Sequence, residues 1–370
     1  MGQTSCRPTR CIAATAAFAL LIVLAAPAMA DDVQEILAAV SQSQFETYQS
    51  TVESMGLGLY DANYDQDFRG RDGWEGVGSL GSQETRLYLT DQFAAMGLAV
   101  SVQGGYMNVV AELAGTQTPE NIYIVGGHYD HVAGDRPGGD DNASGTAGVL
   151  EAARVLSQYS FQSTIRFIGF NAEEDGLLGS TDYVNNVVIP GGENVAGMIN
   201  LDMILRPGWD SNPNAAIDLD LGTRTSETAA VAWANLFKTT AATYVPSLAI
   251  DPTILDVHGA SDQDPFVTNG YPAFLAIENT PTEIWGGASA YYHTAEDASD
   301  RLANDPASPS GVVYDYAFAT DVVRASVALL AQEAVIVPEP ATGALLAAGA
   351  LLLLARRRTA TPAPRRRRHD

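Results

Sequence analysis

Three adjacent acids, Glu173, Glu174 and Asp175, follow an apolar run in the stretch IGFNAEEDGLLGS (168–180). Like charges this close raise one another's pKa, so the group needs a cationic partner. Other segments offer metal-binding side chains: His128 and Asp130 in IYIVGGHYDH, Asp141 in GGDDNASGTAG, Asp202 in MINLDM and His293 in AYYHTAED. Imidazole nitrogens and carboxylates are suitable zinc ligands. We therefore predict that metal ions are the missing partner.

Two metal ions account for the paired glutamates. A carboxylate that bridges two cations is held by both charges, and two ions close together can bind and activate a shared water. If Glu174 ligates a metal, its charge is neutralised and the repulsion within the pair disappears. Glu173 is then free to take a proton from the water and pass it to a leaving group.

The elements expected around these residues alternate between strands and helices. Apolar runs predict strands over 108–113, 122–126, 164–170, 195–201 and 273–277. Helical periodicity predicts helices over 32–56, 82–97, 144–159, 177–185, 226–239 and 312–332. This order favours a single α/β domain with a mixed, mostly parallel central sheet covered by helices on both faces. Functional groups of such sheets gather at the carboxyl ends of strands, where the His, Glu and Asp motifs fall.

With their order along the chain, these motifs resemble those of the co-catalytic dizinc exopeptidase family. The segments are GGHYDHV, DDNASGTAG, NAEEDGLLGS, NLDM and YYHTAED, and the similarity runs from about residue 80 to 334. The family includes secreted bacterial leucyl aminopeptidases and glutamate carboxypeptidases. In the stretch that the family usually writes SDHxPF, Gln263 replaces the His, which is not a metal ligand in that motif.

The resemblance implies a role for each site residue. One Zn²⁺ is expected on His128, Asp141 and Asp202, and a second on Asp141, Glu174 and His293, although other divalent metals fit the same ligands. Glu173 matches the general base, Asp130 the carboxylate that orients His128, and Tyr292 a residue that steadies the oxyanion. The family also implies a cis peptide bond between Asp141 and Asn142.

The two ends of the chain predict export and sorting. Residues 1–30 have a basic start, an apolar run and the small-residue sequence AMA, which is typical of a secretory signal peptide. Both cysteines lie in it, so a thiol plays no part in the expected chemistry. Residues 338–370, with the apolar helix 341–355 and an Arg-rich tail, resemble a PEP-CTERM sorting signal. That resemblance implies a transient inner-membrane anchor and processing by an exosortase-type enzyme; a permanent C-terminal anchor is the alternative.

Charge sets limits on the partners of the central domain, residues 31–337. It holds 11 basic and 42 acidic residues, about 31 net negative charges, which would repel nucleic acid. We expect the domain to act in the periplasm, at the cell surface or outside the cell. The Asp spacing in DANYDQDFRGRD (61–72) makes Ca²⁺ a further candidate partner, but Gln66 stands where a calcium loop needs Gly, which favours a solvated acidic loop.

Other patterns receive simpler interpretations. GVGSLG (76–81) fits the dinucleotide pattern GxGxxG but follows no apolar strand, so that function is rejected. DLDLG (218–222) is interpreted as an edge strand with outward acids. Neither His131 nor His258 is required as a ligand.

The sequence therefore predicts a secreted zinc aminopeptidase acting on peptides with a free N-terminus. Three other functions stay open: a carboxypeptidase or dipeptidase of the same family, a single-zinc acyltransferase resembling glutaminyl cyclases, and a non-catalytic surface or matrix binding protein. Only eight residues separate Leu113 from Ile122, which leaves no room for the protease-associated domain that carboxypeptidase-like members often insert there. This favours the aminopeptidases.

Overall fold

A mixed eight-stranded sheet forms the centre of the protein. The computed structural model describes residues 32–56, 79–132, 137–207, 218–278, 291–299 and 314–337. The strand order is β1-β2-β4-β3-β5-β8-β6-β7. The strands are β1 (Ala99–Gln103), β2 (Asn108–Leu113), β3 (Thr118–His128), β4 (Ser163–Phe170), β5 (Asn194–Leu201), β6 (Leu219–Thr223), β7 (Ile250–Asp256) and β8 (Ala273–Ile277).

The sheet is parallel at its centre and antiparallel towards its sides. Strand β3 pairs in parallel with both β4 and β5, and β5 pairs in parallel with β8. The pairs β1–β2, β2–β4 and β6–β8 are antiparallel. The predicted single α/β domain with a mixed sheet is confirmed.

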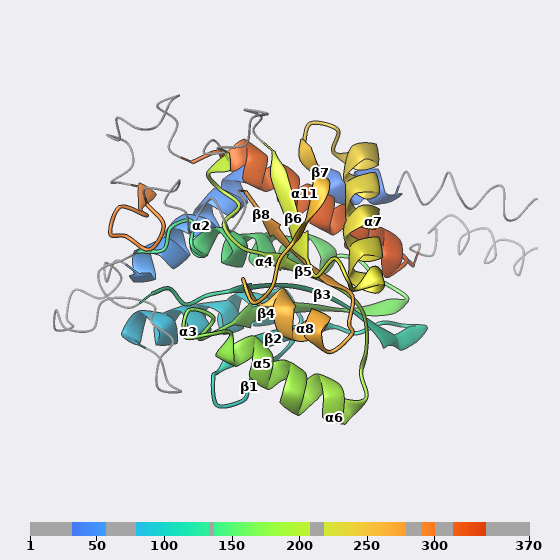
Figure 1. Ribbon diagram of the computed structural model, residues 1–370, viewed down its shortest axis with the longest axis horizontal. Coiled ribbons are helices and arrows are strands. Elements are labelled where there is room, and N and C mark those ends of the chain that lie inside the picture. The colour runs from blue at the N-terminus through green and yellow to red at the C-terminus, as the bar shows by residue number, and fades with distance from the viewer. Residues whose placement is uncertain are drawn as a thin grey trace, which may run out of the picture. The chain divides into compact units, whose positions relative to one another are not determined.

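Helices cover both faces of the sheet (Figure 1). One face carries α2 (Gln42–Gly56), α3 (Leu80–Ala95), α4 (Ala143–Leu156), α7 (Thr228–Tyr244) and α11 (Tyr316–Glu333), whose apolar side chains join one large core. The other face carries α5 (Leu178–Tyr183), the π-helical turn η3 (Val184–Val188), α6 (Ile189–Gly191) and α8 (Gln263–Thr268), packed around a second core.

Helix α4 lies close against the sheet because small residues form its first turns. A Cβ atom at Gly145 would stand 2.1 Å from the carbonyl oxygen of Leu201, so only glycine allows this approach of α4 to β5. Apart from Arg154, every residue of α4 is buried. The close contact holds the start of α4 beside the carboxyl end of β5.

Several elements differ from the sequence prediction. Strands β1 and β7 and helix α8 were not predicted, and the helix expected over 32–56 is interrupted around residues 39–41. The interpretation of DLDLG as an edge strand was wrong. These residues lie in β6, which pairs with β8 on one side and with β7 on the other, and Asp220 is buried. The alternating acids suggested an edge strand, but β7, which was not predicted, pairs with the outer edge of β6.

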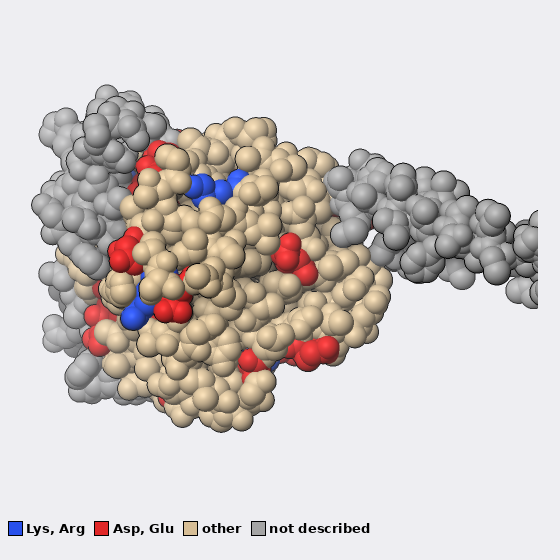
Figure 2. All heavy atoms as spheres, turned by 45° about the vertical axis from the view of Figure 1, so that its right-hand side comes forward, with Lys and Arg blue, Asp and Glu red and all other residues tan. Residues whose placement is uncertain are grey.

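Three predicted segments lie outside the described residues: the signal peptide (1–30), the acidic loop (61–72) and the sorting signal with its apolar helix (338–370). The first half of GVGSLG is also outside, whereas Ser79 caps the N-terminus of α3. Within the described ranges, no helix is long and apolar enough to cross a membrane. Acidic side chains form several separate groups on the face drawn in Figure 2, with few basic ones.

Candidate metal centre

Three neighbouring strands deliver their terminal residues to one end of the sheet. Strand β3 ends at His128, β4 at Phe170 and β5 at Leu201, and β3 pairs in parallel with the other two. Their carboxyl ends therefore adjoin, and the residues that follow, Asp130, the Glu173–Glu174 pair and Asp202, meet there. The predicted gathering of the motifs at strand ends is confirmed.

The bridging candidate, Asp141, stands directly before α4. The peptide bond from Asp141 to Asn142 is cis, as the family resemblance implies. Asn142 begins the helix: its side-chain oxygen accepts the N–H of Gly145 at 2.8 Å, and its amide donates to the carbonyl of Leu201 at 2.9 Å. These contacts join the start of α4 to the end of β5.

His293 comes from a turn far along the sequence. Its backbone has φ = 57°, in the left-handed region, and the ring of Tyr292 stacks on its imidazole with 3.6 Å between centroids. Ala172, Leu177 and Met203, which also lie beside site residues, have positive φ values too. Left-handed backbone in non-glycine residues is a form of strain that collects at functional sites.

Five side chains form two overlapping groups that share Asp141, with ligand atoms close enough to share ions, and a third group of His128, Glu173 and Glu174 meets the same distance. His128, Asp141 and Asp202 make one group and Asp141, Glu174 and His293 the other, each within 4.8 Å. His128 Nε2 lies 3.4 Å from Asp141 Oδ1 and 3.3 Å from Asp202 Oδ1. His293 Nε2 lies 3.2 Å from Asp141 Oδ2 and 3.0 Å from Glu174 Oε2. Asp141 thus presents one oxygen to each group.

The two groups differ in their access to solvent. The side chain of His128 is 1% exposed, and those of Asp141 and Asp202 are 7% and 9% exposed. In the second group Glu174 is 8% exposed, but the imidazole of His293 is 30% exposed. The centre is therefore buried on its His128 side and open on its His293 side.

Asp130 contacts three parts of the centre at once. Its Oδ1 lies 3.5 Å from His128 Nδ1, while its two carboxylate oxygens accept the backbone N–H groups of Glu173 and Glu174 at 3.2 and 3.3 Å. The imidazole of His128 therefore turns Nε2 towards Asp141 and Asp202. One carboxylate orients this imidazole and the backbone of both glutamates.

The arrangement satisfies its own polar atoms poorly. His293 Nε2 and Glu174 Oε1 are buried and have no hydrogen-bond partner among the described residues, although Nε2 lies 3.0 Å from Glu174 Oε2. His293 Nε2, Asp141 Oδ2 and Glu174 Oε2 therefore converge on a common point. Buried polar atoms without partners are costly, so a cation at that point fits the donor set.

Burial and the neighbouring carboxylates shift the pKa values of these side chains. Burial and the adjacent Asp141 carboxylate raise the pKa of Glu174 to about 7, and burial raises the pKa of Glu173 well above its usual value. Burial lowers the pKa of His293, but the carboxylates of Asp141 and Glu174 outweigh this and raise it to about 10. Each of these three side chains therefore holds a proton more firmly than it would in water.

A further layer of side chains, which the sequence analysis did not assign, supports the ligands. The Ser261 hydroxyl donates to Asp202 Oδ2 at 2.6 Å, and Asn200 donates to Ser261 at 2.7 Å. Asp262 is fully buried beside them, and burial raises its pKa to about 7. Gln263, at the position of the family His, accepts a hydrogen bond from Asn200 at 3.2 Å. The only signal for this layer in the sequence was the altered SDHxPF motif.

The remaining predicted residues take no place in the two groups. Tyr292 packs on Met203, Leu275 and Ile277 while it stacks on His293. His131 is buried and bonds to the carbonyl of Val132, and His258 is exposed beside Asp256 at 3.3 Å.

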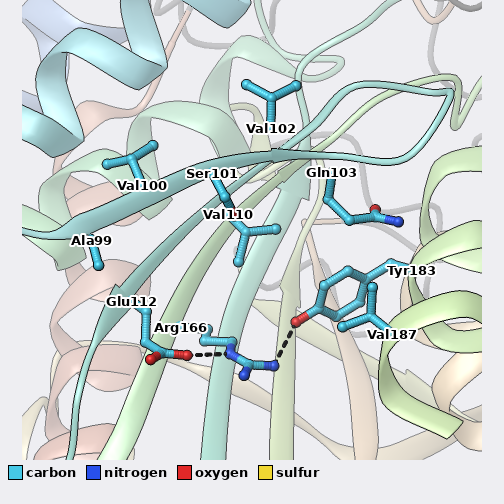
Figure 3. A pocket seen from close by; sticks show the side chains of 10 residues that line it. All are labelled: Ala99, Val100, Ser101, Val102, Gln103, Val110, Glu112, Arg166, Tyr183 and Val187. Atoms are coloured by element: carbon cyan, nitrogen blue, oxygen red, sulfur yellow. Dashed lines mark hydrogen bonds and ion pairs between the residues drawn. The ribbon is translucent and has the colours of Figure 1, made fainter. Parts of the chain in front are cut away.

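A separate hollow of about 420 Å³ lies over β1, β2 and β4, beside η3 (Figure 3). Arg166 in its floor donates to Glu112, Glu193 and Tyr183. None of the predicted site residues lines this hollow.

Comparisons with known proteins point to peptidases. The family described as peptidase family M28 matches residues 108–311. The chain is 44% identical over 107 residues to a probable zinc metalloprotease of Pyrenophora tritici-repentis, covering 26% of this chain and 24% of that protein. It is 31% identical over 215 residues to a probable leucine aminopeptidase 2 of Aspergillus oryzae, covering 54% of this chain and 41% of that one. The chain thus spans well under half of these relatives.

Solved structures with the same fold include enzymes of two kinds. The LapA aminopeptidase of Legionella pneumophila superposes with a TM-score of 0.63 at 20% identity, over 82% of this chain and 75% of that one. A glutaminyl cyclase of Porphyromonas gingivalis gives 0.61 at 18% identity, over 80% and 99%. At these identities the likeness shows the fold alone and does not separate the two activities.

Proposed function

Because the chain belongs to peptidase family M28, we propose that it is a zinc-dependent aminopeptidase that uses two ions to remove residues from the free N-terminus of peptides. The observation that carries the proposal is the pair of ligand groups that share Asp141, with Glu173 beside them. The names of the two relatives, a zinc metalloprotease and a leucine aminopeptidase, support the metal and the kind of peptidase.

The ligands expected to hold the ions are those whose atoms already converge. His128, Asp141 and Asp202 would hold one ion, and Asp141, Glu174 and His293 the other. Two imidazoles and three carboxylates match zinc in both ligand type and charge. When bound, zinc polarises a carbonyl oxygen and lowers the pKa of water.

Glu173 is the residue that we propose carries the proton of the attacking water. Its backbone N–H is fixed by Asp130 at 3.2 Å, and burial raises the pKa of its carboxyl well above the usual value. A carboxylate in this position can take a proton and hold it until the leaving amine accepts it. We assign Glu173 the transfer from the attacking water to the amino group of the departing product.

Asp130 and Tyr292 have supporting roles in this proposal. Asp130 keeps the imidazole of His128 in one orientation through Nδ1, as the partners of metal-bound histidines usually do. Tyr292 stands next to His293, and we assign its hydroxyl a hydrogen bond to the developing oxyanion. Tyr292→Phe should lower kcat more than it changes KM.

The test offers one peptide in two forms, with its N-terminus free or acetylated, and follows released amino acids with and without a zinc chelator. We expect release from the free form only, and its loss with the chelator. Cleavage of the acetylated peptide would instead indicate a carboxypeptidase. No release from either peptide by the zinc-loaded protein would overturn the proposal.

The same preparation separates the two remaining functions. A glutaminyl cyclase would hold one zinc ion per chain and release ammonia from a peptide that begins with Gln, without cleaving a peptide bond. A binding protein would retain peptides without changing them. Metal analysis and mass spectrometry of the products distinguish these results.

A further inference from the structure

Asp297 joins the two loops that carry Asp141 and His293, two of the three ligands of one proposed ion. It lies four residues after His293, and its side chain is buried. Its Oδ1 accepts the backbone N–H of Asp140 and its Oδ2 accepts that of Asp141, both at 3.0 Å. A single carboxylate from the His293 loop therefore holds the backbone of the bridging residue through two hydrogen bonds.

Further contacts fix Asp297 itself in this position. Its carbonyl accepts the N–H of Gly139 at 2.9 Å, and the hydroxyl of Tyr314 donates to its Oδ1 at 3.3 Å. A Cβ at Gly139 would stand 2.2 Å from the Tyr314 oxygen and 3.2 Å from the Asp297 carbonyl oxygen, so glycine is needed where this loop packs against both residues. The crossing is thus tightly packed as well as hydrogen-bonded.

We propose that Asp297 is a positioning residue that sets the bridging Asp141 in register with His293. Asp141 and His293 belong to the same proposed ligand group, but their loops are separated by more than 150 residues of chain. Because Asp297 binds one loop and belongs to the other, it fixes the distance between the two ligands. The inference deepens the proposed function and rests on its metal centre.

The chemistry of the contact requires a group with two acceptors. Both N–H groups point at the carboxylate, and an asparagine there would turn its own NH₂ group towards one of them. One backbone donor would then lose its partner, and the loop would shift. Since losing a side chain that supports a ligand typically weakens metal binding about 10–100-fold, a loss of that size is expected.

The experiment compares the full-length protein with Asp297→Asn, Tyr314→Phe and the matched control Glu296→Gln. Glu296 is the exposed neighbour of Asp297. Zinc affinity is measured by competition with a chromophoric chelator, and folding of the metal-free proteins by circular dichroism. We expect Asp297→Asn to bind zinc about 10–100-fold more weakly, Tyr314→Phe to show a smaller loss, and Glu296→Gln to match the wild type. Excess zinc should restore part of the activity of Asp297→Asn.

The results separate this inference from the function on which it rests. A wild-type protein that binds no zinc would overturn the metal centre itself. If the wild type binds zinc and a folded Asp297→Asn protein binds it equally well, the positioning role alone is overturned. If Asp297→Asn does not fold, Tyr314→Phe decides: weakened zinc binding supports the inference, and unchanged binding overturns it.

Discussion

Two clusters of charged side chains in this protein meet opposite requirements. The first surrounds Arg166, whose guanidinium donates to Glu112 at 2.8 Å, to Glu193 at 2.6 and 2.9 Å and to the Tyr183 hydroxyl at 2.8 Å. The second is the candidate metal centre, where the corresponding distances run from 3.0 to 3.4 Å and some buried atoms have no hydrogen bond.

The difference shows which cluster is complete. Around Arg166 the cation belongs to the chain, so folding alone assembles the charges and their hydrogen bonds. In the candidate metal centre the chain supplies acids and imidazoles but no permanent cation among the five converging side chains. The first cluster should therefore matter for stability and the second for function, and each prediction below tests that division.

The largest expected effect is on turnover. Glu173→Gln should lower kcat by about 10²–10⁴-fold, because general-base catalysis contributes that much. Zinc content should not change, since Glu173 is not in the two ligand groups that share Asp141. Initial-rate kinetics and metal analysis check this, with exposed Glu120→Gln as the matched control. Activity equal to that of the wild type would remove Glu173 from the mechanism.

The next effect concerns the Arg166 cluster. Arg166→Met should lower the free energy of unfolding by about 3 kcal/mol, because it leaves Glu112 and Glu193 without their shared cation. Chemical denaturation of the zinc-loaded protein measures the change. Zinc affinity should stay as in the wild type, and a parallel loss of zinc would show that the two clusters are coupled.

Removal of zinc should affect only the second cluster. At free zinc about 100 times the dissociation constant, chelation should lower the free energy of unfolding by about 2.7 kcal/mol for each ion removed, the stabilisation that binding at one site supplies. The same decrease is expected in Arg166→Met, since effects at independent sites add. Denaturation of both proteins with and without chelator forms a double-mutant cycle, and a decrease that differs between them contradicts independence.

The smallest expected effect, taken per pH unit, is the change of stability with pH in the metal-free protein. The pKa of Glu174 is raised from 4.5 to about 7, so the folded state keeps a proton that the unfolded state releases, and stability falls as pH rises through this window. The raised pKa of His293, about 10, gives the same sign between pH 6.5 and 10. Each proton contributes at most about 1.4 kcal/mol per pH unit. Denaturation at several pH values measures the slope, which should be shallower with zinc.

The sequence predicted the ligand residues of the candidate centre better than the side chains that hold those ligands in place. The five converging residues are each part of a short motif, and four of them follow strands or begin a helix whose apolar pattern is clear. The contacts of Asp297 could not be predicted, because its partners are backbone N–H groups 156 and 157 residues away. Backbone donors leave no trace in residue type.

The errors in the fold also arise where the structure depends on contacts between distant segments. No residue of β1 is buried and only Asp251 of β7 is, so neither strand shows the apolar pattern of a core strand. The acids of DLDLG alternate with apolar residues as on an edge strand, but β7 pairs with β6 and is itself the edge strand. The partners of Arg166 lie in β2, in α5 and in the turn just before β5, and nothing in any one segment indicates that they meet.

The uneven exposure of the two imidazoles has a consequence in time. His293 is 30% exposed, whereas His128 is 1% exposed and lies behind the carboxylates. An ion at the His293 group has a short path to solvent, and one at the His128 group must wait for the protein to open. The two ions should then exchange at different rates, so that a chelator mixed rapidly with the loaded protein withdraws one within a fast phase and the other in a slow phase. Between the two phases the protein would hold one ion, at the His128 group.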